Sequence, residues 1–200
     1  MMRALWSASS GMLAQQLNID VISHNLSNVN TNGFKKSRLE FQDLLYETIR
    51  GASPTADGGY VPSDLSVGHG VRPSATLRIF STGNLQLTQN PLDVAIEGDG
   101  FFVVELPSGE EAYTRDGSFK LDADGDLVTT DGYLVMPGIN IPPGAKSIVI
   151  AADGTISYEL AGDAVTGDQI TLAQFPNPAG LRALGRNLFL ATEAAGTVAD

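Results

Sequence analysis

The sequence predicts an α+β protein, with a long N-terminal amphipathic helix followed by an elongated, hairpin-rich antiparallel β body. Two observations support this prediction. The first 34 residues carry a regular apolar seam of helical spacing, and the chain from Val67 onward is a series of short β-prone runs separated by Asp-Gly pairs.

The N-terminal stretch has its apolar residues at alternating steps of three and four. We call these positions the apolar seam, and all of them except Gln15 are apolar: Leu5, Ala8, Met12, Gln15, Ile19, Ile22, Leu26 and Val29. Such a heptad pattern is typical of a helix that packs against another helix. The positions off the seam are small or polar and carry few charges. An amphipathic helix that packs only on its own domain remains the alternative at this point.

The motif that follows predicts where the helix ends. Gly33 stands where a left-handed residue commonly terminates a helix, and glycine adopts this conformation without steric cost. Phe34 and Val29 would then make the hydrophobic contact of a Schellman motif. Lys35 would lie beside the negative end of the helix dipole. The residues that we expect to form this helix-cap motif are Asn25, Asn28, Asn30, Asn32, Gly33 and Phe34.

The remaining chain divides by composition. Residues 1–34 form the predicted axial helix with its capped end, and residues 35–66 form a connecting segment. Within this segment, residues 37–50 favour either helix or extended chain, and residues 51–66 are rich in Gly, Pro, Ser and Asp, as in a linker. Residues 67–192 form the predicted antiparallel β domain, and residues 193–200 a frayed tail.

Turn signals organise the predicted β domain. Asp-Gly pairs begin at residues 57, 99, 116, 124, 131 and 153, and this dipeptide favours tight hairpins because both residues tolerate positive φ. Such a density of turns predicts antiparallel hairpins and gives no support to a βαβ architecture. The predicted strands are residues 76–80, 85–88, 93–97, 101–106, 127–130, 147–151, 155–160, 169–175 and 187–191.

Composition excludes several classes of function. The formal net charge of −11 makes nucleic acid an unsuitable partner, and the absence of cysteine excludes disulfides and thiolate chemistry. No apolar run reaches the length of a membrane span, so we expect no membrane insertion, and the N-terminus lacks the pattern of a cleaved signal peptide. Residues 1–50 carry five basic and four acidic side chains, whereas residues 51–200 carry seven and nineteen. We therefore expect a helix that packs and a body that stays solvated.

No stretch carries the chemistry of an enzyme. Asp122, Asp124 and Asp126 resemble the start of a calcium loop, but the glycine and the glutamate that such a loop requires are out of register, which favours a hairpin turn. Glu110-Glu111 favours a solvated surface, and neither His24 nor His69 belongs to a cluster with metal-ligand spacing in the sequence. We predict no catalytic residue, no cofactor and no metal site.

A resemblance to a known family rests on specific residues. Residues 21–35, VISHNLSNVNTNGFK, together with Gly11-Met12 and Gln15-Gln16, resemble the N-terminal signature of the bacterial flagellar rod and hook proteins. His24 and Ser27 depart from the usual Asn and Ala. The resemblance continues through residues 68–73, 90–102 and 113–119 and weakens after about residue 150. Residues 40–46, EFQDLLY, are more similar to distal rod members than to hook members.

The resemblance implies a structural subunit of the flagellar basal-body distal rod, which assembles with itself into a helical tube and transmits motor torque to the hook. Its implied partners are other copies of itself, neighbouring proximal rod and hook proteins, and the surrounding ring proteins. It also implies export by the flagellar type III apparatus. For residues 51–66 it implies a role in rod straightness, with an ordinary linker as the alternative. Family members end in a second long helix that does not appear in residues 1–200, so the sequence is either a fragment or belongs to a chain without that helix. The alternatives are a proximal rod or hook protein, or a β-rich binding or adhesion module with a helical oligomerisation handle.

Overall fold

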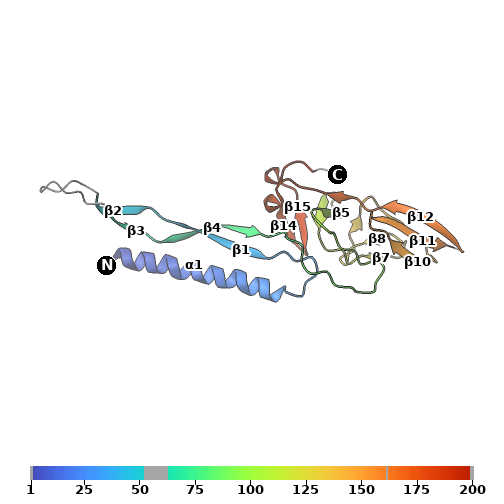
Figure 1. Ribbon diagram of the computed structural model, residues 1–200, viewed down its shortest axis with the longest axis horizontal. Coiled ribbons are helices and arrows are strands. Elements are labelled where there is room, and N and C mark those ends of the chain that lie inside the picture. The colour runs from blue at the N-terminus through green and yellow to red at the C-terminus, as the bar shows by residue number, and fades with distance from the viewer. Residues whose placement is uncertain (1, 52–62, 161, 199–200) are drawn as a thin grey trace. The chain divides into compact units, whose positions relative to one another are not determined.

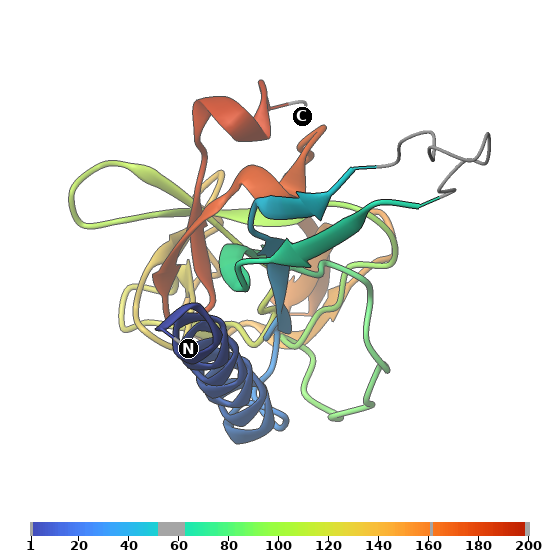
Figure 2. The same cartoon turned by 90° about the vertical axis from the view of Figure 1, so that its left-hand side faces the viewer.

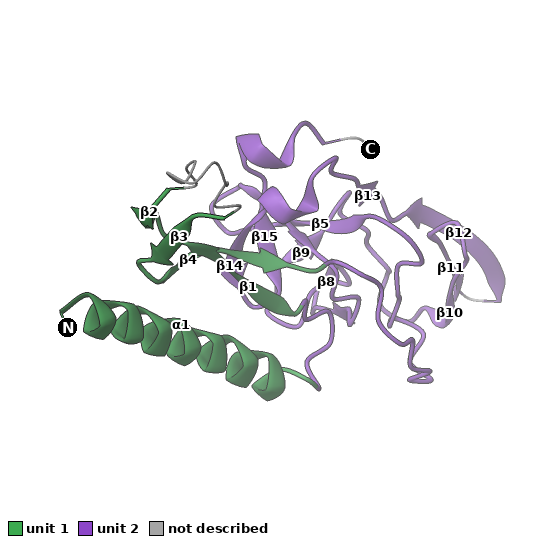
Figure 3. Ribbon diagram, turned by 60° about the vertical axis from the view of Figure 1, so that its left-hand side comes forward, with its two compact units in different colours: residues 1–29, 36–79 green, residues 30–35, 80–200 purple. Residues whose placement is uncertain are grey.

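The structure, a computed structural model, describes residues 2–51, 63–160 and 162–198 and divides into two compact units. Unit 1 comprises residues 1–29 and 36–79, and unit 2 comprises residues 30–35 and 80–200 (Figure 3). One long helix and antiparallel sheets make up the described chain, which confirms the predicted α+β class. The division differs from the predicted one, because residues 67–79 pair with the strands that follow the helix and not with the β body.

Unit 1 consists of helix α1 (Met2–Ser27) and an antiparallel ribbon of four strands (Figure 1). Strand β1 (Ser37–Asp43) pairs with β4 (Val71–Arg78), and β2 (Tyr46–Arg50) pairs with β3 (Leu65–Gly68). Backbone hydrogen bonds between residues 44–45 and 69–70 join the two pairs into one ribbon. Residues 37–50, which favoured either helix or strand by sequence, are therefore mainly extended. Most of the predicted linker, residues 52–62, lies outside the described residues.

Helix α1 ends at Ser27, earlier than its sequence predicted. Side chains satisfy the last carbonyls, because Ser27 Oγ donates to Ser23 O and Asn28 Nδ2 donates to His24 O, each at 2.9 Å. The Schellman prediction was wrong: Phe34 N donates to Thr31 O in a separate turn beyond the helix. The positive φ of Gly33 is confirmed at 68°.

Unit 2 contains an eight-stranded antiparallel sheet and a three-stranded antiparallel sheet. The larger sheet runs β14-β15-β6-β5-β9-β8-β7, with β13 also paired to β5, and the smaller runs β10-β11-β12. The bounds are β5 (Phe101–Glu105), β6 (Glu111–Thr114), β7 (Lys120–Leu121), β8 (Leu127–Val128), β9 (Leu134–Val135), β10 (Lys146–Ile150), β11 (Thr155–Leu160), β12 (Asp163–Gln169), β13 (Leu172–Ala173), β14 (Arg182–Gly185) and β15 (Leu188–Leu190).

Strand β5 lies at the centre of unit 2 and is buried on both faces. Phe102 and Val104 belong to one core cluster with Phe119, whereas Phe101 and Val103 belong to a second cluster with other aromatic side chains. Alternate residues of a strand point to opposite faces, so a strand buried on both faces is apolar throughout. This accounts for the continuous run Phe-Phe-Val-Val in the sequence.

Three of the Asp-Gly pairs form the predicted hairpin turns. They connect β7 to β8, β8 to β9 and β10 to β11, and Gly125, Gly132 and Gly154 have φ of 90°, 84° and 84°. Only the glycines have positive φ, so these are turns closed by a left-handed glycine rather than turns with two left-handed residues. The pair at residue 57 lies outside the described residues, and those at 99 and 116 connect no hairpin.

Some predicted elements differ from the structure. Residues 85–88 form no strand, and residues 93–97 contribute only one isolated bridge, from Asp93 to Ser118. Glu193–Ala195, expected in a frayed tail, form a short 3-10 helix in which Ala195 is fully buried. Asn177 stabilises this segment, because its backbone N–H donates to Ala195 O and its side chain donates to Ala194 O.

Candidate assembly surface

The face of α1 that packs on the ribbon is small and polar. We call this face the inner stripe. The ribbon strands that α1 contacts within unit 1 are β1 and β4. Ala14 is buried with 3% of its surface exposed, and its neighbours on this face are partly buried. The members of the inner stripe are Ser7, Ser10, Gly11, Ala14, Asn18, Val21 and Asn25. Small side chains let the helix approach the ribbon closely, so this face uses little of the apolar content of the helix.

Gly70 marks the closest approach between α1 and the ribbon. A Cβ atom at this position would lie 2.3 Å from Ser10 Oγ, and Gly70 has a φ of 115°. The Ser10 hydroxyl accepts a hydrogen bond from Val71 N at 3.3 Å and donates to Ser7 O at 2.8 Å. A glycine is therefore required here both by its backbone conformation and by the helix beside it.

The predicted apolar seam is exposed along its whole length. Leu5, Met12, Ile19 and Ile22 have 67%, 68%, 61% and 55% of their surface exposed, so the ribbon leaves these four residues uncovered. The other seam residues, Ala8, Gln15, Leu26 and Val29, are also exposed. A shallow, mostly apolar hollow lies on the middle of this face and is lined by Ala8, Gly11, Met12, Gln15, Gln16 and Ile19.

A second exposed apolar stripe runs along the N-terminal half of α1. Met2, Trp6, Leu13 and Leu17 have 74%, 73%, 59% and 41% of their surface exposed, and we call these residues the second stripe. At 3.6 residues per turn, their mean direction lies roughly 150° around the helix from the seam. This stripe was not predicted from the sequence, although its spacing of four, seven and four residues is itself a heptad pattern. Figure 2 views the helix from its N-terminal end, nearly along its axis.

Charge is almost absent from both stripes. Arg3 and Asp20 are the only residues of α1 that carry a full charge at neutral pH. Arg3 forms an ion pair with Glu47 of β2, within unit 1. Copies of this helix would therefore meet little like-charge repulsion. Two exposed apolar stripes on a nearly neutral helix are a patch that an isolated soluble chain rarely carries without a partner.

The six residues predicted to form the helix cap do not form one motif, and they make different contacts. Asn25 bonds to Ser37 at the start of β1, and Asn28 caps the carbonyl of His24. Asn30 is exposed at the end of the turn that follows the helix. Asn32 and Gly33 belong to unit 2 and pack within it, since Asn187 Nδ2 donates to Asn32 O at 2.7 Å and a Cβ on Gly33 would lie 2.8 Å from Asp116 Cα.

The acidic turn of Asp122, Asp124 and Asp126 is organised by its own backbone. Asp122 Oδ1 accepts hydrogen bonds from Asp124 N at 2.9 Å and from Asp126 N at 3.0 Å, and Asn140 Nδ2 donates to Asp126 Oδ1 at 2.7 Å. Across the described ranges, no group of three or more metal-ligating side chains could hold an ion. No helix in the described chain is long and apolar enough to span a membrane.

Comparisons with known proteins place the chain in a family. Residues 5–35 match the family described as flagella basal body rod protein, and residues 95–158 match the flagellar hook protein FlgE/F/G D1 domain. The flagellar basal-body rod protein FlgG of Caulobacter vibrioides is 51% identical over 98% of this chain and 76% of its own length. FlgG of Borreliella burgdorferi is 50% identical over the same shares. The hook protein FlgE of Helicobacter mustelae is 47% identical, over 68% of this chain and 30% of its own length.

The chain therefore belongs to the flagellar rod and hook protein family. Its similarity over nearly the whole sequence is to FlgG, the distal rod protein, and the hook protein matches a smaller part. The chain is accordingly a structural subunit of the distal rod, and the comparisons favour this function over the proximal rod, hook and adhesion-module alternatives.

Proposed function

We propose that α1 builds the rod, with the apolar seam and the second stripe packed against helices of other subunits. The observation that supports this proposal is which face of the helix is buried. The face with small and polar side chains packs on the chain's own ribbon, whereas the large apolar side chains are exposed. Burial of a Leu, Ile or Met side chain contributes about 1.5–3 kcal/mol. The seam alone offers several such side chains to a partner.

Two different stripes on one helix favour an open assembly. A two-fold dimer would pair like with like and leave the other stripe in water. Contacts between unlike surfaces do not close on themselves, so they propagate as a helical array. In this proposal the seam forms the helix–helix core of the tube, and the second stripe joins each helix to a further neighbour.

The acidic β body suits the outer wall of such a tube. Residues 80–200 carry seventeen acidic and five basic side chains, and this excess of negative charge favours solvation of the body and disfavours non-specific association. The proposed partners, besides other copies, are the neighbouring proximal rod and hook proteins and the surrounding ring proteins of the basal body. We also propose that the chain reaches the periplasm-spanning rod through the flagellar type III apparatus.

The test places charges on the seam. Cells whose chromosomal copy carries Ile19→Asp and Ile22→Asp should fail to extend the rod, as seen in electron micrographs of purified basal bodies. Near-ultraviolet circular dichroism of the purified chain should remain unchanged. Ser9→Asp with Ser23→Asp adds the same charge at exposed helix positions outside both stripes, so this control should still form rods. Normal rods from the seam variant would contradict the proposal.

A further inference from the structure

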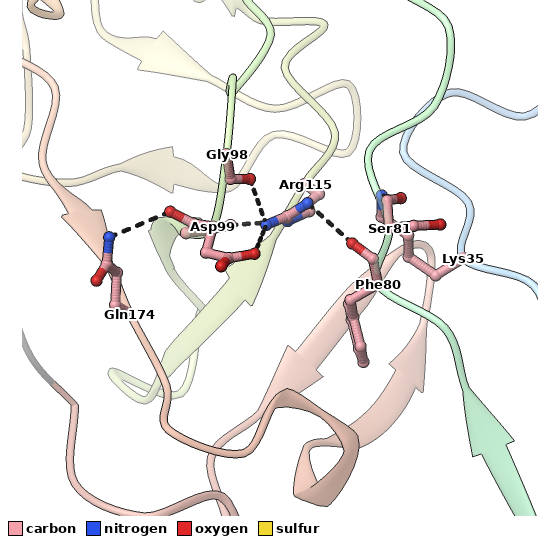
Figure 4. A network of polar contacts seen from close by, with 8 residues as sticks. Lys35, Phe80, Ser81, Gly98, Asp99, Arg115 and Gln174 are labelled. Atoms are coloured by element: carbon pink, nitrogen blue, oxygen red, sulfur yellow. Dashed lines mark hydrogen bonds and ion pairs between the residues drawn. The ribbon is translucent and has the colours of Figure 1, made fainter.

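The chain passes between its two units at three points: after Val29, after Lys35 and after Ile79. On the unit 2 side these crossings are residues 30–35 and the segment that begins at Phe80. Both segments meet a single polar network built around Arg115, and all of its members belong to unit 2 (Figure 4).

Arg115 lies at the centre of this network and is almost fully buried, with 6% of its side chain exposed. Its guanidinium donates to three backbone carbonyls: Nε to Gly100 O at 2.8 Å, Nη2 to Gly98 O at 2.9 Å and Nη1 to Phe80 O at 3.1 Å. The guanidinium carbon also lies 5.2 Å from the centre of the Phe101 ring. The planar fork of an arginine can bridge several acceptors in this way, whereas a lysine ammonium cannot reproduce the geometry.

Lys35 extends the network to the other crossing segment. Its ammonium group donates to Ser81 O at 2.8 Å, which joins the end of residues 30–35 to the segment at Phe80. Partial burial, and then the nearby positive charge of Arg115, lower the pKa of Lys35. The carboxylate of Asp99 lies 3.8 Å from Arg115 and is 99% exposed, so backbone carbonyls provide most of the compensation for the two cations.

Residues 30–35 also lie directly against the residue that follows Arg115. A Cβ on Gly33 would come within 2.8 Å of both the N and Cα atoms of Asp116, so only a glycine fits. Beside it, Asn187 Nδ2 donates to Asn32 O at 2.7 Å. The motif that suggested a helix cap is therefore a segment fitted onto the β body.

We infer that residues 30–35 and 80–81 form a junction in which Arg115 is the positioning residue that anchors all three chain crossings to the β body. In this junction Gly33, Lys35 and Arg115 together hold the crossing segments on the β body, although Arg115 is distant from the other two residues in sequence. It is a property of the single chain and does not rest on the proposed assembly, so its test and the test of rod growth can fail independently.

Hydrogen–deuterium exchange of the purified full chain tests the junction. Arg115→Lys keeps the charge but loses the three-way bridge, and we expect exchange in peptides covering residues 30–36 and 79–83 to rise at least about tenfold. Peptides from β5 and β6 should keep their protection. Arg182→Lys, at an exposed position of β14, should change neither region. An equal rise of exchange in β5 and β6 would overturn the inference, because Arg115 would then stabilise the core in general. Unchanged exchange in residues 30–36 and 79–83 would also overturn it, because Arg115 would then not hold the junction.

A second variant leaves Arg115 in place and keeps the test valid if Arg115→Lys does not fold. Gly33→Ala should increase exchange in residues 30–36 and should speed tryptic cleavage after Lys35 and Lys36. Gly132→Ala is the matched control, because Gly132 also has positive φ, at 84°, and its Cβ would meet no atom within 4 Å. If residues 30–36 remain equally protected in both variants, the fit of Gly33 against Asp116 does not hold the junction.

Discussion

Asn25 of α1 makes two hydrogen bonds to the backbone of Ser37 at the start of β1. Its Nδ2 donates to Ser37 O at 2.7 Å, and its Oδ1 accepts from Ser37 N at 2.9 Å. The amide side chain thus satisfies both polar groups of a strand residue, as a neighbouring strand would. This pair fixes the position of the helix along the ribbon within unit 1.

Asn25→Ala should therefore loosen the helix from the ribbon. Both backbone groups of Ser37 would lose their partner at a partly buried site, and the free energy of unfolding should fall by about 1–3 kcal/mol. Urea unfolding followed by circular dichroism at 222 nm measures this loss. Asn30→Ala removes the same side chain from an exposed turn and should change stability by less than about 0.5 kcal/mol. Equal losses from the two variants would contradict the assigned role of Asn25.

The close approach of Gly70 to Ser10 gives a second prediction, which a double mutant can isolate. Gly70→Ala should destabilise unit 1 both through its positive φ and through the clash with Ser10 Oγ. Gly144→Ala has a similar φ, 100°, with open space around the Cβ, and should show only the backbone strain of about 1–3 kcal/mol.

Combining Gly70→Ala with Ser10→Ala removes the clashing oxygen, so the double variant should recover part of the loss. Chemical denaturation of the four proteins of the cycle measures the interaction energy between the two sites. Strict additivity of the two single changes would show that the helix does not press on Gly70.

Much of the fold could be predicted from local patterns. The heptad spacing correctly located a helix, and three Asp-Gly pairs correctly located hairpins, because side-chain periodicity and glycine conformation are properties of neighbouring residues. The run Phe101–Glu105 was recognisable as a strand for the same reason. Short strands such as β7 and β9, with two residues each, are defined by their partners rather than by their own sequence.

The missed features depend on contacts between residues distant in the sequence. Gly33 has the positive φ that a helix cap needs, but the glycine is required because it packs against Asp116. No local sequence pattern reveals that contact. The burial of Arg115 is equally invisible in the sequence, because carbonyls of residues 80, 98 and 100 surround it. The second stripe was detectable, since its spacing is regular. The longer apolar seam by itself accounts for a helix at these residues, so the second stripe was not needed to predict one.

The hairpin between β10 and β11 should show a specific dependence on pH. Thr155 donates hydrogen bonds to the carboxylate of Asp153 and lowers its pKa below the ordinary value of 3.8. A lowered folded pKa stabilises the native state above pH 3.8, and this contribution is lost as the pH falls through the folded pKa.

Asp153→Ala should therefore lower the melting temperature at pH 7, and the effect should shrink as the pH falls from 3.8 through the folded pKa of Asp153. Calorimetric scans of both proteins across this range measure the difference. Asp131→Ala shortens the corresponding side chain in the turn between β8 and β9 and controls for the general effect on an Asp-Gly turn. A difference that grows toward low pH would reverse the assigned sign.

The acidic turn between β7 and β8 should bind no calcium tightly. Asp122 already uses one carboxylate oxygen to accept two backbone hydrogen bonds, and the turn lacks the remaining oxygen ligands of a calcium loop. Isothermal titration with calcium at micromolar concentration should give no saturable heat. A one-site isotherm that disappears in Asp124→Ala would show that the turn is a metal site.

The second stripe should be required for assembly but not for folding. Trp6 and Leu13 are 73% and 59% exposed, so Trp6→Gln with Leu13→Gln should change the stability of the isolated chain by less than about 0.5 kcal/mol for each substitution. Rod length in electron micrographs should nevertheless fall, because the proposed second neighbour loses its apolar contact. Met12→Gln with Ile19→Gln makes the same change in polarity on the seam.

If the two stripes contact different neighbours, each pair of substitutions should shorten rods, and the combination should have a larger effect than either pair alone. Full-length rods from the Trp6 and Leu13 variant, with short rods only from the seam variant, would show that the seam alone builds the assembly and that the second stripe faces solvent.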